Sequence, residues 1–265
     1  MDTNGGYTEF PFVSEFYDSV YDQLNRGDIE FFVDMAKEVG GPVLEVACGT
    51  GRVLIPTAKA GIDIVGTDLS EKMLDRCREK LSAESAEVQG RVELIHADMR
   101  DFNLCRKFKL VTIPFRPFQH LTTVEDQFSC LKAIHRHLDD DGKFTLDVFN
   151  PSILMLAREN RTEELGDEPE FEMPDGRKVV RRYRNPEIDF ANQIAHGELI
   201  YYVTHPDGRT ERLVHSFPMR YLFRYEAEHL LVRCGYEVED VFSDFKKSPY
   251  GENYPREIIM VARKS

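Results

Sequence analysis

The stretch VLEVACGTGR, residues 43–52, combines one acid with two closely spaced glycines. Its apolar residues predict a strand buried on both faces, and Glu45 places in that strand a charge that burial alone would not select. Gly49 and Gly51 follow the strand and precede a predicted helix, where glycine lets a ligand lie against the backbone. A carboxylate before such a loop repels pyrophosphate and suits a ligand that carries hydrogen-bond donors. We therefore expect a partly cationic ligand.

Two further acids end the next two predicted strands. Asp68 closes IDIVGTD, where a carboxylate can accept hydrogen bonds from both hydroxyls of a ribose. Asp98 closes ELIHAD, where it can accept a hydrogen bond from an exocyclic amine such as that of adenine. Because ligands bind outside the carboxyl ends of the strands in open α/β sheets, we expect these acids and Glu45 to line one rim.

Two other glycine-loop chemistries fit this stretch less well. A dinucleotide-binding loop reads G-x-G-x-x-G, but Val53 and Leu54 stand where the third glycine belongs. A triphosphate-binding loop needs G-x-x-x-x-G-K followed by serine or threonine, and the sequence does not contain it. Both nucleotide classes are therefore disfavoured.

Alternating strand and helix patterns position these residues. A helix is predicted over 28–39 with Asp28 as its N-cap. Strands are predicted over 43–47, 62–67, 91–96, 109–114 and 143–149, and helices over 52–60, 70–81 and 124–138. Strands separated by helices form parallel units with right-handed crossovers. The predicted fold class is therefore α/β, with a doubly wound sheet.

The pattern changes after residue 150. An acidic stretch precedes three strand-like runs at 177–184, 194–204 and 210–220, and Pro206-Asp207-Gly208 predicts a hairpin turn between the last two. A helix at 225–234 and strands at 236–242 and 256–263 then return to the first pattern. We divide the chain into a core with an N-terminal helical cap at 1–150, an inserted antiparallel β lid at 151–220, and the rest of the core sheet at 221–265.

Composition narrows the partners. The chain has 265 residues and a formal net charge of -13, which argues against a broad basic face for nucleic acid and favours a small-molecule substrate. Its five cysteines are scattered and unpaired by spacing, so we expect neither a disulfide framework nor a metal site. The N-terminus lacks a signal-peptide pattern and no run is long enough to cross a membrane, so we expect a cytoplasmic protein without membrane contact. The oligomeric state is not predicted.

VLEVACGTGR, GTDLS at 66–70 and HADM at 96–99 resemble, in order, the motifs of class I S-adenosylmethionine-dependent methyltransferases. The resemblance implies a Rossmann-like, seven-stranded sheet whose last hairpin is antiparallel. It also implies S-adenosylmethionine as cofactor and S-adenosylhomocysteine as product. The cofactor-binding residues expected from the motifs and their surroundings are Tyr21, Glu45, Ala47, Gly49, Gly51, Arg52, Asp68, Leu69, Met73, Asp98, Met99 and Pro114.

Two of these positions carry open questions. The family pattern has a glycine where this chain has Ala47, and alanine fits if the backbone there stays in the β region. Arg52 could reach the carboxylate of the cofactor from the helix start, or it could be an ordinary solvated side chain.

The acceptor side is less defined. The segment IPFRPFQHL, 113–121, follows the fourth strand, where the resemblance implies contact with the transferred methyl group. His120 is a candidate general base, or it only hydrogen-bonds the loop. Candidate acceptor-binding residues are Tyr17, Phe115, Phe118, His120, Arg182 and Tyr202. Their structural alternatives are core packing for the aromatic side chains and a solvated or ion-paired strand face for Arg182.

The predicted function is methyl transfer to nitrogen or oxygen of a small molecule by direct in-line displacement. Two alternatives stay open. One is a nicotinamide-dependent reductase, which shares the sheet but should have the third glycine. The other is a non-catalytic protein that binds S-adenosylmethionine without turnover.

Overall fold

The computed structural model describes residues 10–21, 26–166 and 168–265. Its helical elements are α1 (Pro11–Tyr21), α2 (Asp28–Val39), α3 (Leu54–Lys59), α4 (Glu71–Ser82), α5 (Ala86–Gln89), η1 (Pro117–His120), α6 (Val124–His137), α7 (Ile153–Leu156) and α8 (Arg224–Arg233). The main-sheet strands are β1 (Val43–Val46), β2 (Ile64–Asp68), β3 (Val92–His96), β4 (Phe108–Ile113), β5 (Leu138–Phe149), β10 (Tyr236–Phe242) and β11 (Glu257–Lys264). A second sheet contains β6 (Phe171–Glu172), β7 (Lys178–Asp189), β8 (Ile194–Thr204) and β9 (Thr210–Arg220).

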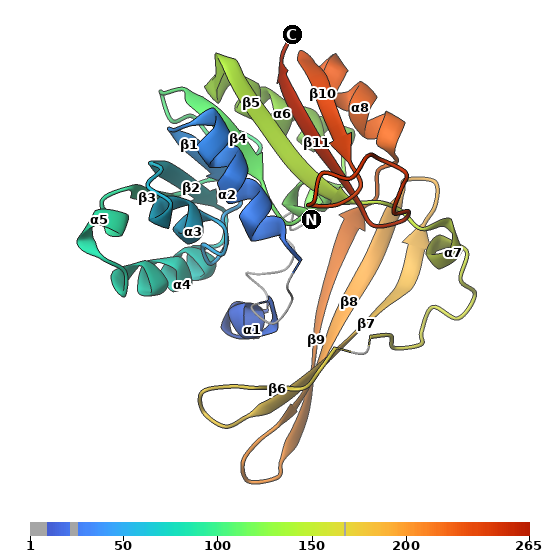
Figure 1. Ribbon diagram of the computed structural model, residues 1–265. Coiled ribbons are helices and arrows are strands. Elements are labelled where there is room, and N and C mark those ends of the chain that lie inside the picture. Colours follow the sequence, from blue (N-terminus) through green and yellow to red (C-terminus); the bar gives the residue numbers. More distant parts are fainter. Residues whose placement is uncertain (1–9, 22–25, 167) are drawn as a thin grey trace.

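The main sheet has the order β10-β11-β5-β4-β1-β2-β3 (Figure 1). Strands β1 to β5 pair in parallel, and β11 runs antiparallel to both β5 and β10. The chain therefore reverses its strand order beside β1 and β4, which is where open α/β sheets bind ligands. The predicted α/β fold with seven strands and an antiparallel last hairpin is confirmed.

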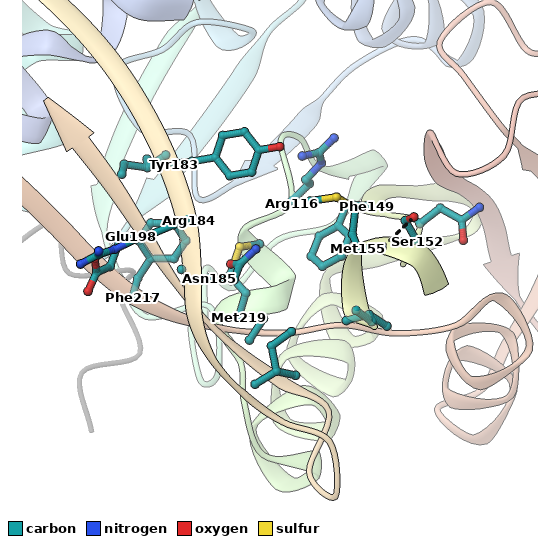
Figure 2. A pocket seen from close by; sticks show the side chains of 16 residues that line it. Arg116, Phe149, Ser152, Met155, Tyr183, Arg184, Asn185, Glu198, Phe217 and Met219 are labelled. Carbon is teal, nitrogen blue, oxygen red and sulfur yellow. Dashed lines mark hydrogen bonds and ion pairs between the residues drawn. The ribbon is translucent and has the colours of Figure 1, made fainter. Parts of the chain in front are cut away.

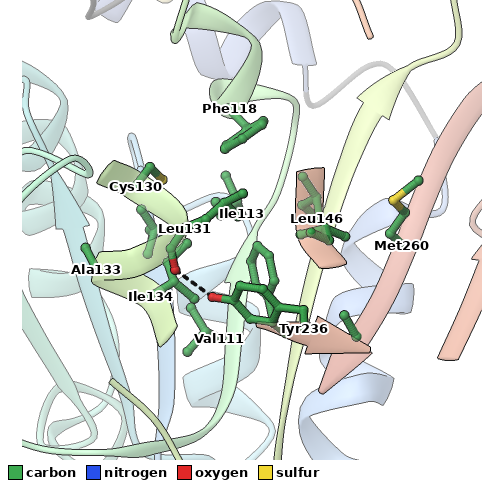
Figure 3. Packing of buried hydrophobic residues seen from close by; sticks show 14 of the residues in the cluster. Val111, Ile113, Phe118, Cys130, Leu131, Ala133, Ile134, Leu146, Tyr236 and Met260 are labelled. Atoms are coloured by element: carbon green, nitrogen blue, oxygen red, sulfur yellow. Dashed lines mark hydrogen bonds between the residues drawn. The ribbon is translucent and has the colours of Figure 1, made fainter. Parts of the chain in front are cut away.

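Buried apolar side chains hold helices on both faces of this sheet. One cluster joins the sheet to α6 and α8, and a second joins it to α2, α3 and α4. In the first cluster the Tyr236 hydroxyl donates a 2.7 Å hydrogen bond to the Leu131 carbonyl, so a polar atom in the core is satisfied (Figure 3). The four residues of β1, including Glu45, are all buried, as expected for a central parallel strand.

Two local predictions were wrong. Asp28 does not cap α2: Gly27 occupies that position with a left-handed backbone, and the Asp28 side chain points instead to Arg52. Strand β5 begins at residue 138 rather than 143, because Leu138 already pairs with Phe108 of β4 and the turn residues 139–142 form an irregularity within the strand.

The second sheet is antiparallel in the order β6-β7-β8-β9 and extends away from the main sheet as a long twisted ribbon (Figure 1). Strands β8 and β9 have the predicted bounds and are joined by the predicted hairpin turn, in which Gly208 has a φ of 85°. Strand β7 continues to residue 189, beyond the predicted 184, because a register shift between Arg184 and Glu187 accommodates Pro186.

Helix α1 packs on the second sheet rather than on the main one. A separate apolar cluster joins Phe16 and Val20 of α1 to Val179, Tyr201 and Val203 of the second sheet. Tyr17 of α1 lies near the carboxyl edge of the main sheet, where it lines a hollow together with Gly49 and Asp68. Within the described residues, no helix is long and apolar enough to cross a membrane.

Candidate active site

Asp68 holds the glycine loop between β1 and α3. One carboxylate oxygen accepts a 2.8 Å hydrogen bond from the Gly49 amide, and the other accepts one of 2.8 Å from the Ser70 amide. Burial raises the pKa of Asp68 above its usual value, although the amide donors favour its charged form. Each carboxylate oxygen has a second lone pair. Asp68 can therefore fix the loop and still accept hydrogen bonds from a ligand.

The two glycines of the loop differ in their surroundings. A Cβ on Gly49, which has a φ of 55°, would meet no atom within 4 Å, so the space above it is open to a ligand. A Cβ on Gly51, which has a φ of 79°, would lie 2.5 Å from the Cys77 sulfur. Gly51 is therefore required by packing against α4, whereas Gly49 offers its backbone to the cofactor side.

Ala47 lies in the left-handed region with a φ of 58°, so the expectation of a β-region backbone was wrong. The turn that brings the Cys48 amide 2.9 Å from the Thr67 carbonyl imposes this conformation. For a residue with a Cβ it costs about 1–2 kcal/mol.

We expect Ala47→Gly to raise the free energy of unfolding by about 0.5–1 kcal/mol, since relief of the left-handed strain outweighs the extra entropy of glycine in the unfolded chain. Denaturant unfolding measures it. A matched Ala133→Gly change in α6, where the backbone is helical, should instead destabilise the protein. A loss of stability in Ala47→Gly would contradict the strain argument.

Glu45 is buried beneath the loop. The side chain is 2% exposed, and its Oε2 has no hydrogen-bond partner among the described residues. Burial raises the pKa of Glu45 to about 8, against the opposing effect of the Arg52 charge. The carboxyl group is therefore mainly protonated at neutral pH and braces the loop from below. It is not among the residues that line the hollow above the loop.

This raised pKa makes a prediction about stability. An acid whose pKa is raised in the folded state stabilises the fold below its unfolded pKa, near 4.5, and that stability is lost as the pH rises toward the folded value of about 8. Glu45→Gln removes the titrating group. We expect its free energy of unfolding, relative to the unmodified protein, to increase between pH 5 and pH 8.5, as followed by urea denaturation. A constant difference across this range would mean that Glu45 is ionised in the fold.

Arg52 is buried rather than solvated, and its guanidinium points to Asp28 and does not line the hollow over the glycine loop. It is 9% exposed, and its guanidinium donates two hydrogen bonds to Asp28, one of them of 3.3 Å. The guanidinium carbon also lies 4.7 Å from the centre of the Phe115 ring. Arg52 thus ties α2 to the loop after β4, a role that the sequence did not predict.

Asp98 is occupied by a neighbour in the chain. Arg100 donates side-chain hydrogen bonds to both carboxylate oxygens, and it also reaches Asp126. Partial burial would raise the pKa of Asp98, but the hydrogen bonds from Arg100 outweigh burial and hold it below its usual value. Met99 packs at the border of the main core, and the Leu69 carbonyl lies 2.8 Å from the His96 Nε2, from which it accepts a hydrogen bond. Asp98, Met99 and Leu69 do not line the hollow that lies over the glycine loop.

A hollow of about 60 Å³ lies over the glycine loop, large enough for only a few water molecules. Eight of the predicted site residues surround it together with Pro117: Tyr17, Ala47, Gly49, Asp68, Met73, Pro114, Phe115 and His120. The donor set fits S-adenosylmethionine, because Asp68 supplies acceptors for a ribose, Gly49 an open backbone and the rings of Tyr17 and Phe115 faces that attract a sulfonium. Tyr17 is the residue by which α1 borders this space.

The α1 aromatics meet the loop after β4. The Tyr21 ring lies edge-on to Phe115 with ring centres 4.7 Å apart, and the Tyr17 ring is 4.6 Å from that of Tyr21. Burial raises the pKa of Tyr17 far above its usual value, so its hydroxyl stays neutral. Arg181 from β7 donates a 2.9 Å hydrogen bond to the Tyr21 hydroxyl and links this cluster to the second sheet.

Phe115 and Arg116 are two successive left-handed residues, each with a φ of 71°. The Phe115 amide donates a 2.6 Å hydrogen bond to Asp147, and the Arg116 guanidinium pairs with Glu257. Burial, reinforced by the Glu257 charge, raises the pKa of Asp147 to about 7. Sequence analysis missed Asp147 and Glu257. An acid inside the apolar strand LDVF was the available signal for Asp147, and it parallels Glu45 in VLEV.

A second cavity, of about 390 Å³, lies between the end of β5, α7 and strands β7 to β9. Figure 2 shows Phe149, Met155 and Tyr183 around it, each from a different element. Consecutive residues line the two spaces: Phe115 lines the hollow and Arg116 lines the cavity. His120 makes a second link: it lines the hollow, and its ring centre lies 5.6 Å from that of Phe217, which lines the cavity.

Three predicted acceptor residues lie elsewhere. Phe118 is 1% exposed within the main core, and Arg182 donates a 3.1 Å hydrogen bond to the neighbouring Arg181 carbonyl. Tyr202 is 39% exposed and donates to Glu164. None of the three lines the cavity or the hollow. Strand alternation alone could not tell which face of the second sheet turns toward the site.

Comparisons with known proteins agree with this arrangement. The sequence model of the methyltransferase domain matches residues 43–142. The putative methyltransferase YqeM of Bacillus subtilis (strain 168) is 25% identical over 234 residues, which cover 85% of this chain and 83% of YqeM. The dTDP-3-amino-3,4,6-trideoxy-alpha-D-glucopyranose N,N-dimethyltransferase of Streptomyces venezuelae is 33% identical over 137 residues, 49% of this chain and 54% of that enzyme. The glycopeptide N-methyltransferase MtfA, solved with S-adenosylmethionine, is 25% identical with a TM-score of 0.59, over 92% of this chain and 96% of MtfA.

The strand order is that of a class I methyltransferase fold, and an open glycine and an acid lie at the ends of its adjacent strands β1 and β2. Together with the similarities it leaves neither the reductase nor the non-catalytic alternative supported. The chain is a class I S-adenosylmethionine-dependent methyltransferase, and S-adenosylmethionine is its cofactor.

Proposed function

We propose that this enzyme methylates a nitrogen atom of a small-molecule amine, and that the amine binds in the 390 Å³ cavity under the second sheet. One observation carries the proposal: the left-handed pair Phe115–Arg116 sends consecutive side chains to the cofactor hollow and to this cavity. An acceptor in the cavity therefore has a short path to the cofactor. The second sheet acts in this proposal as the acceptor lid.

The acids that line the two spaces are already hydrogen-bonded, which favours an amine. Asp68 accepts hydrogen bonds from the Gly49 and Ser70 amides, and Glu198 accepts one from Arg184. Glu45 and Asp147, whose pKa values are raised to about 8 and about 7, line neither space. The His120 Nδ1 lies 3.3 Å from the Pro218 carbonyl, which holds this side chain against the second sheet. An amine that arrives deprotonated needs no base. The similar sugar and glycopeptide enzymes described above are both named as N-methyltransferases.

The cofactor supplies an electrophilic methyl group, and the residues of the chain supply position. Asp68 and the Gly49 backbone hold the cofactor side, and the Phe115 turn fixes the boundary with the acceptor. The Tyr17 and Tyr21 rings close the site against water. Orientation of two bound reactants is worth about 7–11 kcal/mol in well-aligned systems, which is enough for catalysis without a covalent enzyme intermediate.

Turnover with matched acceptors tests the proposal. The enzyme is incubated with S-adenosylmethionine carrying a ¹³C-labelled methyl group and with pairs of amines and alcohols of the same carbon skeleton. Mass spectrometry then measures the label. We expect label on the amines only. Transfer to the alcohols in preference to their matched amines would contradict the choice of nitrogen.

His120→Asn provides a separate prediction. General-base catalysis contributes about 10²- to 10⁴-fold, so loss of a base would lower kcat by at least a hundredfold. We expect a change in kcat of less than about threefold and the same pH profile of kcat/KM, because His120 hydrogen-bonds the second sheet. A hundredfold loss that removes the acidic limb of the pH profile would instead make His120 the base.

A further inference from the structure

The lining of the acceptor cavity indicates the kind of amine that it takes. Its walls are mainly apolar and are drawn from the four elements β5, α7, β8 and β9, with the side chains Phe149, Met155, Leu156, Leu199, Phe217 and Met219. Gly197 belongs to the same wall, and a Cβ at this position would lie 3.2 Å from the Phe217 ring. Because Gly197 has no side chain, the Phe217 ring can lie close to β8, which widens the apolar surface of the cavity.

Both guanidinium groups in the lining are already paired. Arg184 of β7 donates a 2.6 Å hydrogen bond to Glu198, its direct neighbour across the ladder on β8. Arg116 donates to both carboxylate oxygens of Glu257, which is 8% exposed and also accepts a 2.6 Å hydrogen bond from Arg26. Arg26 itself lies over the Phe115 ring, outside the cavity lining.

Two cations beside the cavity also have partners. Arg158 and Arg161 line a small adjoining hollow. Arg158 pairs with Glu163, and Arg161 donates a 2.7 Å hydrogen bond to the Leu156 carbonyl and lies over the Phe190 ring. A phosphate or diphosphate that turned to Arg116, Arg184 or Arg158 would have to compete with a carboxylate already paired there, and separation leaves that carboxylate uncompensated.

We propose that the acceptor is an amine with an apolar, alkyl or aryl body and no phosphate group; this rests on the function proposed above. The cavity volume is in the range of about 300–1,000 Å³ that is typical of small-molecule sites. Its neutral polar groups, among them Asn150, Asn185 and Tyr183, can orient such a molecule. In this respect the chain departs from its Streptomyces venezuelae relative, whose named substrate is a dTDP sugar.

Competition binding tests the proposal. The probe is N-phenyl-1-naphthylamine, a neutral aryl amine that fluoresces in apolar sites, titrated into enzyme saturated with S-adenosylhomocysteine. We expect saturable fluorescence, its displacement by 4-phenylbutylamine, and no displacement by a thymidine diphosphate amino sugar at a tenfold higher concentration. Displacement by the nucleotide sugar at equal or lower concentration, or no binding of the naphthylamine, would overturn the proposal.

Variants test whether the probe binds in this cavity and whether the Arg184–Glu198 pair excludes the nucleotide sugar. Ala195→Phe fills the cavity and should abolish the fluorescence. Glu198→Gln leaves the Arg184 charge unpaired, so the nucleotide sugar should now compete at a concentration at least tenfold lower than with the unmodified enzyme. Glu211→Gln is the matched control, because it removes an acid that pairs with Arg209 and lies outside the lining. Equal responses of Glu198→Gln and Glu211→Gln would count against the charge argument.

Calorimetric titration of the same preparations with S-adenosylhomocysteine distinguishes a failure of the proposed acceptor class from a failure of the proposed function. Binding of S-adenosylhomocysteine without binding of the naphthylamine contradicts the acceptor class alone. Failure of the unmodified, folded enzyme to bind S-adenosylhomocysteine contradicts the proposed function. Circular dichroism identifies any variant that does not fold, and Ala195→Leu then replaces Ala195→Phe as a milder filling of the same cavity.

Discussion

Asp68→Ala should weaken the binding of S-adenosylmethionine by about a hundredfold or more, which corresponds to about 2.7 kcal/mol. The change removes the acceptor for the Gly49 and Ser70 amides as well as the carboxylate expected to meet the ribose. Hydrogen bonds to a charged group contribute about 1.5–3 kcal/mol each, so the loss of more than one supports an effect of this size. Isothermal titration calorimetry measures the affinity, and circular dichroism reports whether the fold is retained.

Two comparisons make the Asp68 result specific. Asp68→Asn keeps one carbonyl acceptor but places an amide donor opposite one backbone N–H, so we expect an intermediate loss of affinity. Asp63→Ala removes an acid of the same charge one strand-length away, where the exposed Asp63 pairs with Arg91, and should not alter binding. Unchanged affinity in a folded Asp68→Ala variant would remove Asp68 from the cofactor site.

The sequence was sufficient for the main fold because its strands are marked by short apolar runs and its turns by glycine and proline. VLEV, IVGTD and FKLVTI became β1, β2 and β4, and Thr123 caps α6 by accepting a hydrogen bond from the Asp126 amide. The same local signals located the Gly49 and Asp68 cradle, since both residues follow strands that are adjacent in the sheet.

The acceptor side depended on contacts between distant segments and could not be predicted in the same way. Arg116 and Glu257 are 141 positions apart, and their pairing depends on how β11 enters beside β5. The second sheet is amphipathic only in part, so strand alternation could not tell that Arg184 faces the cavity while Arg182 turns back to the Arg181 carbonyl. Phe115 and Arg116 adopt left-handed conformations, and the segment IPFRPFQHL contains no glycine that would have predicted them.

Arg52→Ala should have the largest effect on stability, lowering the free energy of unfolding by about 3–5 kcal/mol. The change removes one partner of a buried ion pair whose side chains are 7% and 2% exposed, and so leaves the Asp28 carboxylate without its counter-charge. It also removes the guanidinium that lies 4.7 Å from the centre of the Phe115 ring. Urea denaturation followed by fluorescence measures the loss. Arg78→Ala, which breaks exposed pairs with Glu71 and Asp75, should cost about 1 kcal/mol or less.

A double-mutant cycle distinguishes a structural role of Arg52 from contact with the cofactor. If the ion pair accounts for the effect, Asp28→Ala combined with Arg52→Ala should destabilise the protein by at least about 2 kcal/mol less than the sum of the single changes. Burial would raise the pKa of Asp28, but the hydrogen bond and charge of Arg52 outweigh burial and hold it below its usual value of 3.8. Stability from this carboxylate is therefore present above about pH 4 and lost as the pH falls through the lower folded pKa, so the coupling should shrink on acidification. A small loss of stability together with a large loss of affinity for S-adenosylmethionine would show instead that Arg52 acts on the cofactor.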